Sequence, residues 1–270
     1  MKPPSRRSER WYQRQLLWLF NQAISQAIGT DLQTMMQNIL DITNSDTFLD
    51  FSKRFASTML TSTNQNVYKN WREAVFKSTK SRKLYDNMQA EIHSEVENEL
   101  QQLMDENVMY IKSQPEYVAS RLVALANEMV QRGERPEAIK KRMLEMYPHM
   151  TASRATLIAR TEASKASTGL VQVRAQKLGM NWYMWKTSKD QRVRNSHKHM
   201  ENVICNYNNP PSPEALIGKK SQGNYNAGEF PNCRCYASVI VDLDLVSWPA
   251  KVYYNGAIIR MTRRQFEGVM

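Results

Sequence analysis

The sequence predicts an α+β protein, in which a long, mostly helical N-terminal portion precedes a compact module of helix plus a small antiparallel sheet. Two observations carry this prediction. The 270-residue chain contains 16 Met but 9 Gly, and no proline stands between Pro4 and Pro115, a composition that suits long helices. After Gly179 the helical periodicity gives way to short segments in which apolar and polar residues alternate, as they do in half-buried strands.

A chain of this length lies where single hydrophobic cores begin to divide into domains. We therefore expect two parts. Residues 1–114 would form a helical N-terminal anchoring region, and residues 115–270 would form the compact module. Within that module the chemically distinctive residues fall in 155–241, and a C-terminal hairpin is predicted at 251–262.

The first half of the compact module is predicted to be helical up to Gly179. Apolar residues at steps of three and four predict a helix that begins at Pro115: Val118, Leu122, Leu125 and Met129. We expect a shorter helix to stop at Pro148 and a long helix, capped by Thr151 or Ser153, to be closed by Gly179.

The second half of the module is predicted to hold at least three antiparallel strands. They are expected within residues 181–187, 234–243 and 251–262, the last forming a hairpin with Asn255-Gly256 as its two-residue turn. Between the first two lies a long loop rich in Asn, Pro, Gly and Ser, residues 206–232. A loop of this length inside a compact domain is usually functional or tied down by its neighbours.

Composition narrows the class of protein. Hydrophobic residues make up 41% and charged residues 23%, which is ordinary for a globular protein and argues against disorder. No signal peptide or membrane span is visible, since the longest apolar run near the start is LLWLF at 16–20. Three cysteines are too few for a secreted disulfide framework and favour a reducing compartment.

The net charge of +11 is concentrated in one part of the chain. Residues 151–200 hold 10 basic and 2 acidic side chains, a net charge of +8. Such a block attracts polyanions such as DNA, or an acidic protein surface, although a solvated basic face without a partner has the same composition. The side chains expected to be exposed and to contact phosphates are Lys165, Arg174, Lys177, Lys189 and Lys198.

Cysteine and histidine side chains suggest two kinds of site. Zinc is the sharper hypothesis, because the chain offers enough N and S ligands for a tetrahedral ion: His197, Cys205, Cys233 and Cys235. However, a Cys-x-Cys sequence in a regular strand sends its thiols to opposite faces, and only a bend after Pro231 brings both to one ion. We therefore favour buried thiols beside a packed His197, with one thiol in the core and one facing the loop.

Several short motifs follow one another in a recognisable order. They are Ala159-Arg160-Thr161-Glu162 on a helix, Trp185 on a strand, the turn with Asp190, Arg192, Arg194 and His197, and finally Pro231 with Cys233, Arg234 and Cys235. The chain resembles the Mu F-like phage head-morphogenesis family, the minor capsid proteins, over about residues 115–241. The resemblance covers the types of these residues, their order and their spacing.

The resemblance implies a protein without enzymatic activity. Members of that family are thought to join the procapsid in few copies near the portal and to act in head assembly or DNA delivery. The implied partners are the phage portal protein, other head proteins and the packaged double-stranded DNA, with no membrane contact. The implied location is the virion, in the head interior or at the portal vertex, after assembly in the host cytoplasm.

The charged motif residues are expected to be structural. Asp190 and the alternating Arg192 and Arg194 share one side of an extended segment, and we expect Glu162 to pair with Arg192, Arg194 or Arg234 in an internal network. Two alternatives differ in class. One is a basic DNA-binding head protein ejected with the genome. The other is a metal-dependent nuclease, which is less favoured because no histidine follows His199 to complete its site.

Overall fold

The chain folds into two compact units that are interleaved in sequence. The structure, a computed structural model, describes residue 3 and residues 5–27, 32–76 and 93–270, so the rest of the expected N-terminal region, residues 1–2, 4, 28–31 and 77–92, lies outside the described residues. One unit contains residues 6–61 and 102–162, and the other contains residues 1–5, 62–101 and 163–270. The boundary expected between residues 114 and 115 falls inside a helix.

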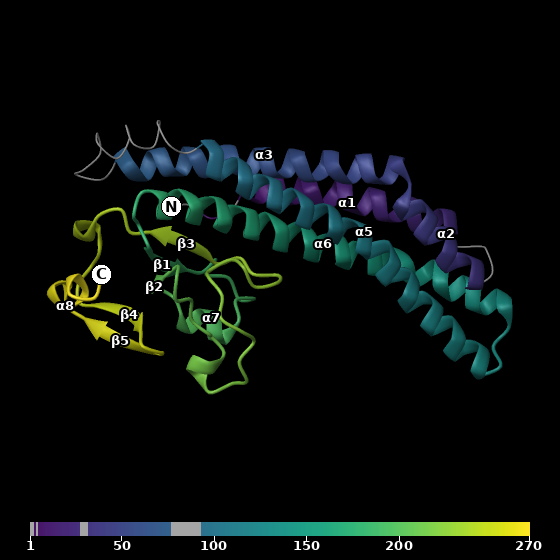
Figure 1. Ribbon diagram of the computed structural model, residues 1–270. Helices are drawn as coiled ribbons and strands as arrows, with labels where there is room; N and C mark the ends of the chain where they lie inside the picture. The colour runs from purple at the N-terminus through teal and green to yellow at the C-terminus, as the bar shows by residue number, and fades with distance from the viewer. Residues whose placement is uncertain (1–2, 4, 28–31, 77–92) are drawn as a thin grey trace. The chain divides into compact units, whose positions relative to one another are not determined.

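Long helices build the first unit, and three of them continue into the second. They are α1 (Arg6–Ala27), α2 (Leu32–Asn44), α3 (Asp46–Phe76), α5 (His93–Gln131) and α6 (Pro136–Lys177), and Figure 1 shows how far each extends. In the first unit, Ile24 of α1 and Ile39 of α2 share a core with Val118 and Leu122 of α5 and with Ile139 of α6. The N-terminal helices and the start of the compact module are therefore held by one hydrophobic core.

Residues 115–179 are mostly helical, as predicted, but the predicted breaks at prolines are wrong. Helix α5 runs through Pro115, and α6 runs through Pro148. An interior proline removes one backbone hydrogen bond and tends to kink or break a helix. The helix can continue through the proline where both of its halves pack in a core. Ile111 and Val118 on either side of Pro115 are fully buried. Thr151 is likewise inside α6, where its hydroxyl donates to Tyr147 O at 3.0 Å.

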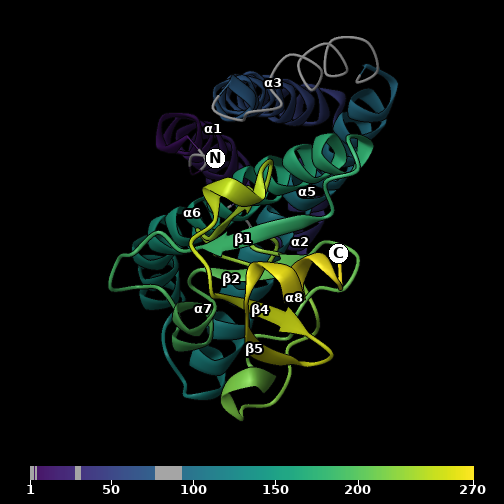
Figure 2. The ribbon, with the colours of Figure 1, turned by 90° about the vertical axis from the view of Figure 1, so that its left-hand side faces the viewer.

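A mixed five-stranded sheet follows the helices, as Figure 2 shows for most of its strands. The strands are β1 (Trp182–Lys186), β2 (Val203–Asn206), β3 (Tyr236–Val239), β4 (Ala250–Tyr254) and β5 (Ala257–Met261), in the order β3-β1-β2-β4-β5. The strands expected within 181–187, 234–243 and 251–262 are present. The prediction of a purely antiparallel sheet was wrong in one respect. Strand β2 was missed, and its pairing with β4 is parallel.

The two pairings of β1 set the register on one side of the sheet. Strand β1 pairs antiparallel with β2, where Tyr183 faces Cys205, and with β3, where Trp185 faces Ala237. Strands β4 and β5 form the predicted hairpin, and Asn255 and Gly256 at its turn have φ of 47° and 82°, the left-handed conformation that a two-residue turn requires. Helix α8 (Arg263–Glu267) then returns to the sheet.

The final helix closes a second, smaller core. Phe266 of α8 is fully buried, and its ring lies 5.0 Å from that of Trp182 in an edge-on arrangement. Ile204, Val252 and Met261 from three strands complete this cluster. Among the described residues, none of the helices combines the length and the apolar character needed to cross a bilayer.

The long loop between β2 and β3 is tied down near its C-terminal end. The Thr168 hydroxyl of α6 donates to Ala227 O at 2.8 Å, and the Tyr183 hydroxyl of β1 donates to Asn226 Oδ1 at 3.1 Å. Gly228, with a φ of +101°, lies so close to α6 that a Cβ atom there would be 2.3 Å from Thr168 Oγ1. These contacts fix the end of the loop directly before the Cys-Arg-Cys residues.

Candidate functional site

Both cysteine thiols of the Cys-Arg-Cys sequence face the same histidine. His197 Nδ1 lies 3.4 Å from Cys233 Sγ and 3.5 Å from Cys235 Sγ. The expectation that the two thiols point to opposite sides is therefore wrong. Its premise fails because strand β3 begins at Tyr236, so that neither cysteine belongs to a regular strand.

A turn before the strand brings the two sulfurs together. Asn232 has a φ of 60°, in the left-handed region, and the Cys233 amide donates to Phe230 O at 3.0 Å. Past this turn the Cys235 amide donates to Cys233 Sγ at 3.3 Å. Such local hydrogen bonds hold the segment curved around the Cys233 sulfur and keep it from extending.

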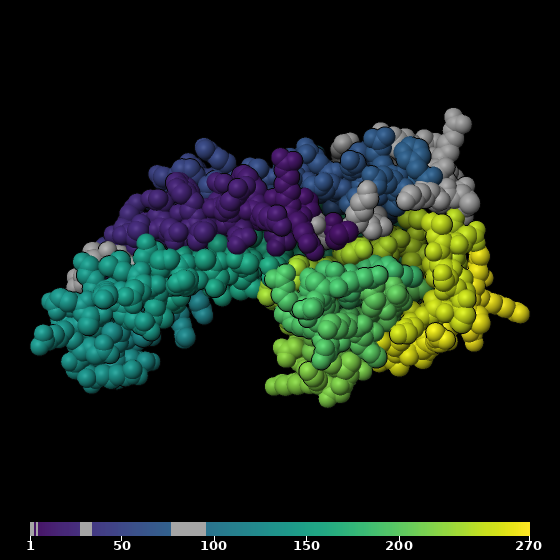
Figure 3. All heavy atoms as spheres, turned by 180° about the vertical axis from the view of Figure 1, so that it is seen from behind, coloured from purple at the N-terminus to yellow at the C-terminus, as the bar shows by residue number. Residues whose placement is uncertain are grey.

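The histidine comes from a short helix on the other side of the cluster. Helix α7 (Asn195–His199) presents Ser196 and His197 to the interior, and His197 is 1% exposed. The imidazole is edge-on to the ring of Trp185, at 5.6 Å between centroids, and to Phe230, at 6.0 Å. The buried wall of the site is therefore aromatic. Figure 3 shows the segment that carries α7 (green) beside the C-terminal segment (yellow).

A hydrogen-bonded chain behind His197 orients the imidazole. His197 Nε2 lies 3.1 Å from the Tyr225 hydroxyl, which donates to Glu214 Oε2 at 2.7 Å. The Ser196 hydroxyl donates to Glu214 Oε1 at 2.9 Å. Burial raises the pKa of Glu214, but the hydrogen bonds from the Tyr225 and Ser196 hydroxyls lower it by more. The net shift is therefore downward, and the group is a carboxylate.

This chain assigns the tautomer of His197. Burial and the hydrogen bond to Glu214 raise the pKa of Tyr225, so the hydroxyl keeps its proton and gives it to the carboxylate. Its oxygen can then only accept from His197 Nε2–H. With the ring proton held at Nε2, Nδ1 is the ring nitrogen that faces both cysteine sulfurs.

The two thiols share their charge unequally. The hydrogen bond from Cys235 holds the pKa of Cys233 well below its usual value, whereas the same hydrogen bond and burial raise the pKa of Cys235. The pair favours a single negative charge on Cys233. A thiolate beside an imidazole is the form that binds metals and attacks electrophiles.

Arginine side chains frame the mouth of this cluster. Arg234 Nη2 lies 2.7 Å from Asp190 Oδ2, and the Arg192 amide donates to Asp190 Oδ1 at 2.9 Å. Arg194 lies over the Phe230 ring at 4.7 Å and donates to Pro231 O at 3.0 Å. The carboxylate thus pairs with Arg234, while the Arg192 and Arg194 side chains, expected to be internal, are exposed.

The remaining motif residues and Cys205 lie elsewhere. Arg160 Nε lies 3.3 Å from Glu9 Oε1 in the helical unit. Glu162 in the same unit is 1% exposed. The pKa of Tyr12 is raised mainly by the burial of Tyr12 itself and secondly by the charge of Glu162. Thr161 is also buried. Cys205 is fully buried in β2, outside the cluster of His197, Cys233 and Cys235. The pairing expected for Glu162 stays a prediction.

The expected basic set divides by exposure. Lys177, Lys189 and Lys198 are exposed, whereas Lys165 is half-buried. Arg174 is only 3% exposed and donates to Asn64 Oδ1 at 2.6 Å and to Leu170 O at 3.1 Å. Its expected role as a surface phosphate contact is therefore wrong. The guanidinium is buried and hydrogen-bonded to Asn64 and to the backbone of α6, so it is not exposed to a partner.

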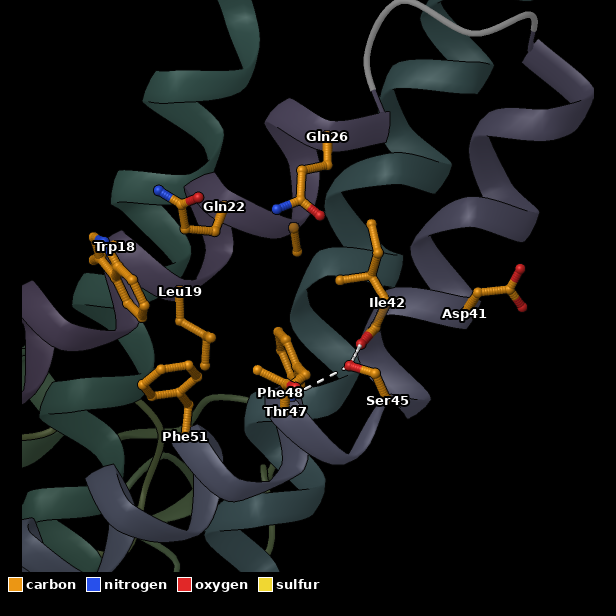
Figure 4. A pocket seen from close by; sticks show the side chains of 11 residues that line it. Trp18, Leu19, Gln22, Gln26, Asp41, Ile42, Ser45, Thr47, Phe48 and Phe51 are labelled. Atoms are coloured by element: carbon orange, nitrogen blue, oxygen red, sulfur yellow. Dashed lines mark hydrogen bonds between the residues drawn. The ribbon is translucent and has the colours of Figure 1, made fainter.

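A separate surface feature lies in the helical unit. Helices α1 and α2 and the start of α3 surround an apolar groove of about 500 Å³ (Figure 4). Trp18 and Phe51 stand at one side with their rings 5.1 Å apart, and Phe48 and Ile42 lie further along. Trp18 is 44% exposed, so part of its ring is accessible to a partner.

Comparison with known proteins identifies the central part of the chain. Residues 122–238 match the family described as phage Mu protein F like protein. The match is to the same family that the motifs predicted. A 92-residue stretch is 36% identical to an uncharacterized protein of Haemophilus influenzae (strain ATCC 51907 / DSM 11121 / KW20 / Rd); it covers 34% of this chain and 18% of that relative. No solved structure matches the chain.

Sequence reasoning missed the two residues that continue the hydrogen-bonded chain from His197 Nε2. Glu214 and Tyr225 both lie in the loop between β2 and β3, where their spacing follows no helical or strand period. The signal that existed was indirect. A 27-residue loop in a compact module had to be functional or tied down, and Glu214 and Tyr225 are both 7% exposed within it.

Proposed function

We propose that this protein is a minor head protein of a tailed bacteriophage, attached to the portal or the inner head shell, where it assists procapsid assembly or DNA packaging and delivery. The observation that carries the proposal is the match of residues 122–238 to the Mu F-like family, which agrees with a head-morphogenesis role. The place of action that follows is the virion, in the head interior or at the portal vertex.

We propose that the protein acts by binding and not by catalysis. The Cys-His cluster adjoins a cavity of about 20 Å³, which is the size of a water molecule and far below the several hundred Å³ of a typical substrate pocket. The buried thiols are 3% and 2% exposed. A phosphodiester or a peptide could not reach them in this conformation.

The apolar groove supports the anchoring role proposed for the N-terminal helices. Aromatic side chains in a groove are well suited to receive an apolar face of a partner helix. Deletion of residues 1–110 would be a poor test, because the deleted helices α1 and α2 share their core with α5 and α6. Surface substitutions in the full-length chain keep that core.

The test is co-purification of the full-length protein with portal rings of its own phage, in the absence of DNA. We expect the wild-type protein to be retained. Trp18→Arg, which places a charge in the groove, should lose retention, whereas Met109→Arg should keep it, because Met109 is a 72% exposed residue of the same unit outside the groove. A wild-type protein that binds neither portal rings nor the shell would refute the proposal.

A second candidate, a basic DNA-binding head protein ejected with the genome, is supported by the exposed lysines of the compact module. Charge reversal at all three should weaken DNA binding and flatten its dependence on salt, by up to about 0.9 in the log–log slope for each phosphate that the protein no longer neutralises. The residues are Lys177, Lys189 and Lys198. Retention on DNA without any salt dependence would contradict this candidate.

A further inference from the structure

We propose that Cys233, Cys235 and His197 bind one zinc ion through the two sulfurs and Nδ1. The three donor atoms lie within 4.8 Å of one another. Zinc–sulfur and zinc–nitrogen bonds of about 2.3 and 2.05 Å at the tetrahedral angle place N and S about 3.5 Å apart. The N···S distances of 3.4 and 3.5 Å match this edge on both sides of the nitrogen.

A single hydrogen bond at Nδ1 accounts for one of the two N···S contacts and not for both. Nδ1 of a neutral imidazole has one lone pair and can accept a proton from only one thiol. Two sulfurs nevertheless lie at nearly the same distance from it, each buried to 3% exposure or less. A cation just outside the plane of the three donor atoms can bond to all of them at once, which gives a reason for the bend that brings the second thiol in.

The surroundings of the three ligands are those of a prepared metal site. Tyr225 accepts from His197 Nε2–H and passes the interaction to Glu214, which fixes the ring and leaves Nδ1 free for the metal. A metal-bound histidine usually donates its other N–H in this way. The amide of Cys235 donates to Cys233 Sγ, which offsets negative charge on that sulfur.

Water supplies the fourth ligand. Among the residues that the structure describes, no further His, Cys, Asp or Glu offers a donor atom within this cluster. The cavity of about 20 Å³ is lined by all three ligand residues, and it has room for one water molecule. Three protein ligands and one water leave zinc with its preferred coordination number of four.

The ion would join two segments that are distant in sequence. His197 is separated from Cys233 by 36 residues and from Cys235 by 38. Zinc would thus fix the turn at residues 231–235 to helix α7 and close the loop between them. This inference is independent of the partner proposed above, because it concerns the isolated chain.

The first test is the metal content of reduced, full-length protein after incubation with zinc sulfate and dialysis. We expect one zinc per chain, with loss of at least tenfold in affinity for Cys233→Ser, Cys235→Ser and His197→Gln. Cys205→Ser is the matched control, since Cys205 is an equally buried thiol outside the cluster, and it should retain full occupancy. Absence of zinc in the wild-type protein, or equal loss in Cys205→Ser, would overturn the proposal.

A second test uses the wild-type protein and therefore does not depend on whether a variant folds. X-ray absorption at the zinc edge should show two sulfur neighbours at about 2.3 Å and two nitrogen or oxygen neighbours at about 2.0–2.1 Å. Coordination by nitrogen and oxygen alone would refute the assignment. The variant Tyr225→Phe, which removes the hydroxyl that accepts from His197 Nε2–H, should fold like the wild-type protein.

The tyrosine variants separate orientation from bulk packing. Tyr225→Phe should lower zinc affinity about 10- to 100-fold, the usual effect of removing a group that orients a ligand. Tyr207→Phe should leave affinity unchanged, since the buried Tyr207 hydroxyl has no hydrogen-bond partner among the described residues. Equal affinities in the two variants would show that the hydrogen-bonded chain does not orient the ligand, and the proposal as stated would fail.

Discussion

Gly228 is the position where a single methyl group should disturb the contact between the long loop and helix α6. Its φ of +101° disfavours any L side chain, and a Cβ atom there would lie 2.3 Å from Thr168 Oγ1 and 3.0 Å from Cys235 O. The Thr168 hydroxyl cannot simply turn away, because it donates to Ala227 O at 2.8 Å. Gly228→Ala must therefore move the loop, the helix or both.

Two contributions to the free energy of unfolding can be separated. The positive φ costs on the order of 1–3 kcal/mol for alanine. The steric overlap costs about 1–3 kcal/mol, as overpacking does in cores, and breaking the Thr168 hydrogen bond adds about 1 kcal/mol. The close packing itself therefore contributes about 2–4 kcal/mol beyond the backbone strain.

Gly223 provides the matched control. It has the same φ of +101°, but a Cβ atom there would meet nothing within 4 Å. Gly223→Ala carries the strain without the overlap, so the difference between the two variants isolates the overlap. At about 2–4 °C per kcal/mol, Gly228→Ala should melt at least about 4 °C below Gly223→Ala in thermal unfolding followed by circular dichroism. Equal melting temperatures would refute the close packing of this loop on α6.

Three further predictions concern buried or paired polar groups. Asp190→Asn should destabilise the protein by about 1 kcal/mol or less at pH 7 in urea unfolding. Burial raises the pKa of Asp190, but hydrogen bonds and nearby arginines lower it by more, so the net shift is downward. The stabilisation is therefore present above the unfolded pKa near 4 and is lost as the pH falls through the folded pKa. A difference between Asp190→Asn and wild type that persists at pH 2 would contradict this prediction. Asn64→Ala should cost about 1.5–3 kcal/mol, because it leaves the buried Arg174 guanidinium with one partner fewer. Tyr12→Phe should cost about 1–3 kcal/mol, because Asn107 Oδ1 loses the donor that lies 2.9 Å away in the core.

One exposed substitution serves as the control for these variants. Lys177→Ala changes a solvent-exposed side chain near the end of α6 and should alter stability by less than about 0.5 kcal/mol. If Asn64→Ala or Tyr12→Phe had an effect no larger than this, the buried hydrogen bonds described for them would be absent in solution.

The fold could be predicted where the signal was long and periodic. Helical spacing over residues 115–179 and the Asn255-Gly256 turn both carried enough local information to be correct. The prolines misled because local propensity was weighed without the core, which buries residues of α5 on both sides of Pro115. Strand β2 was missed because it has four residues, three of them buried in succession, and so shows no alternation.

The candidate site shows why spacing alone was insufficient. The alternation rule was applied to Cys233 and Cys235 as though the strand had already begun, whereas it begins one residue after Cys235. A signal for a turn was present, since proline followed by asparagine is a turn-forming pair and asparagine tolerates the left-handed region that Asn232 occupies. Once a turn precedes the first cysteine, both sulfurs can face one side. Which side they face depends on α7 and on the loop that carries Tyr225, segments that only the folded chain brings together.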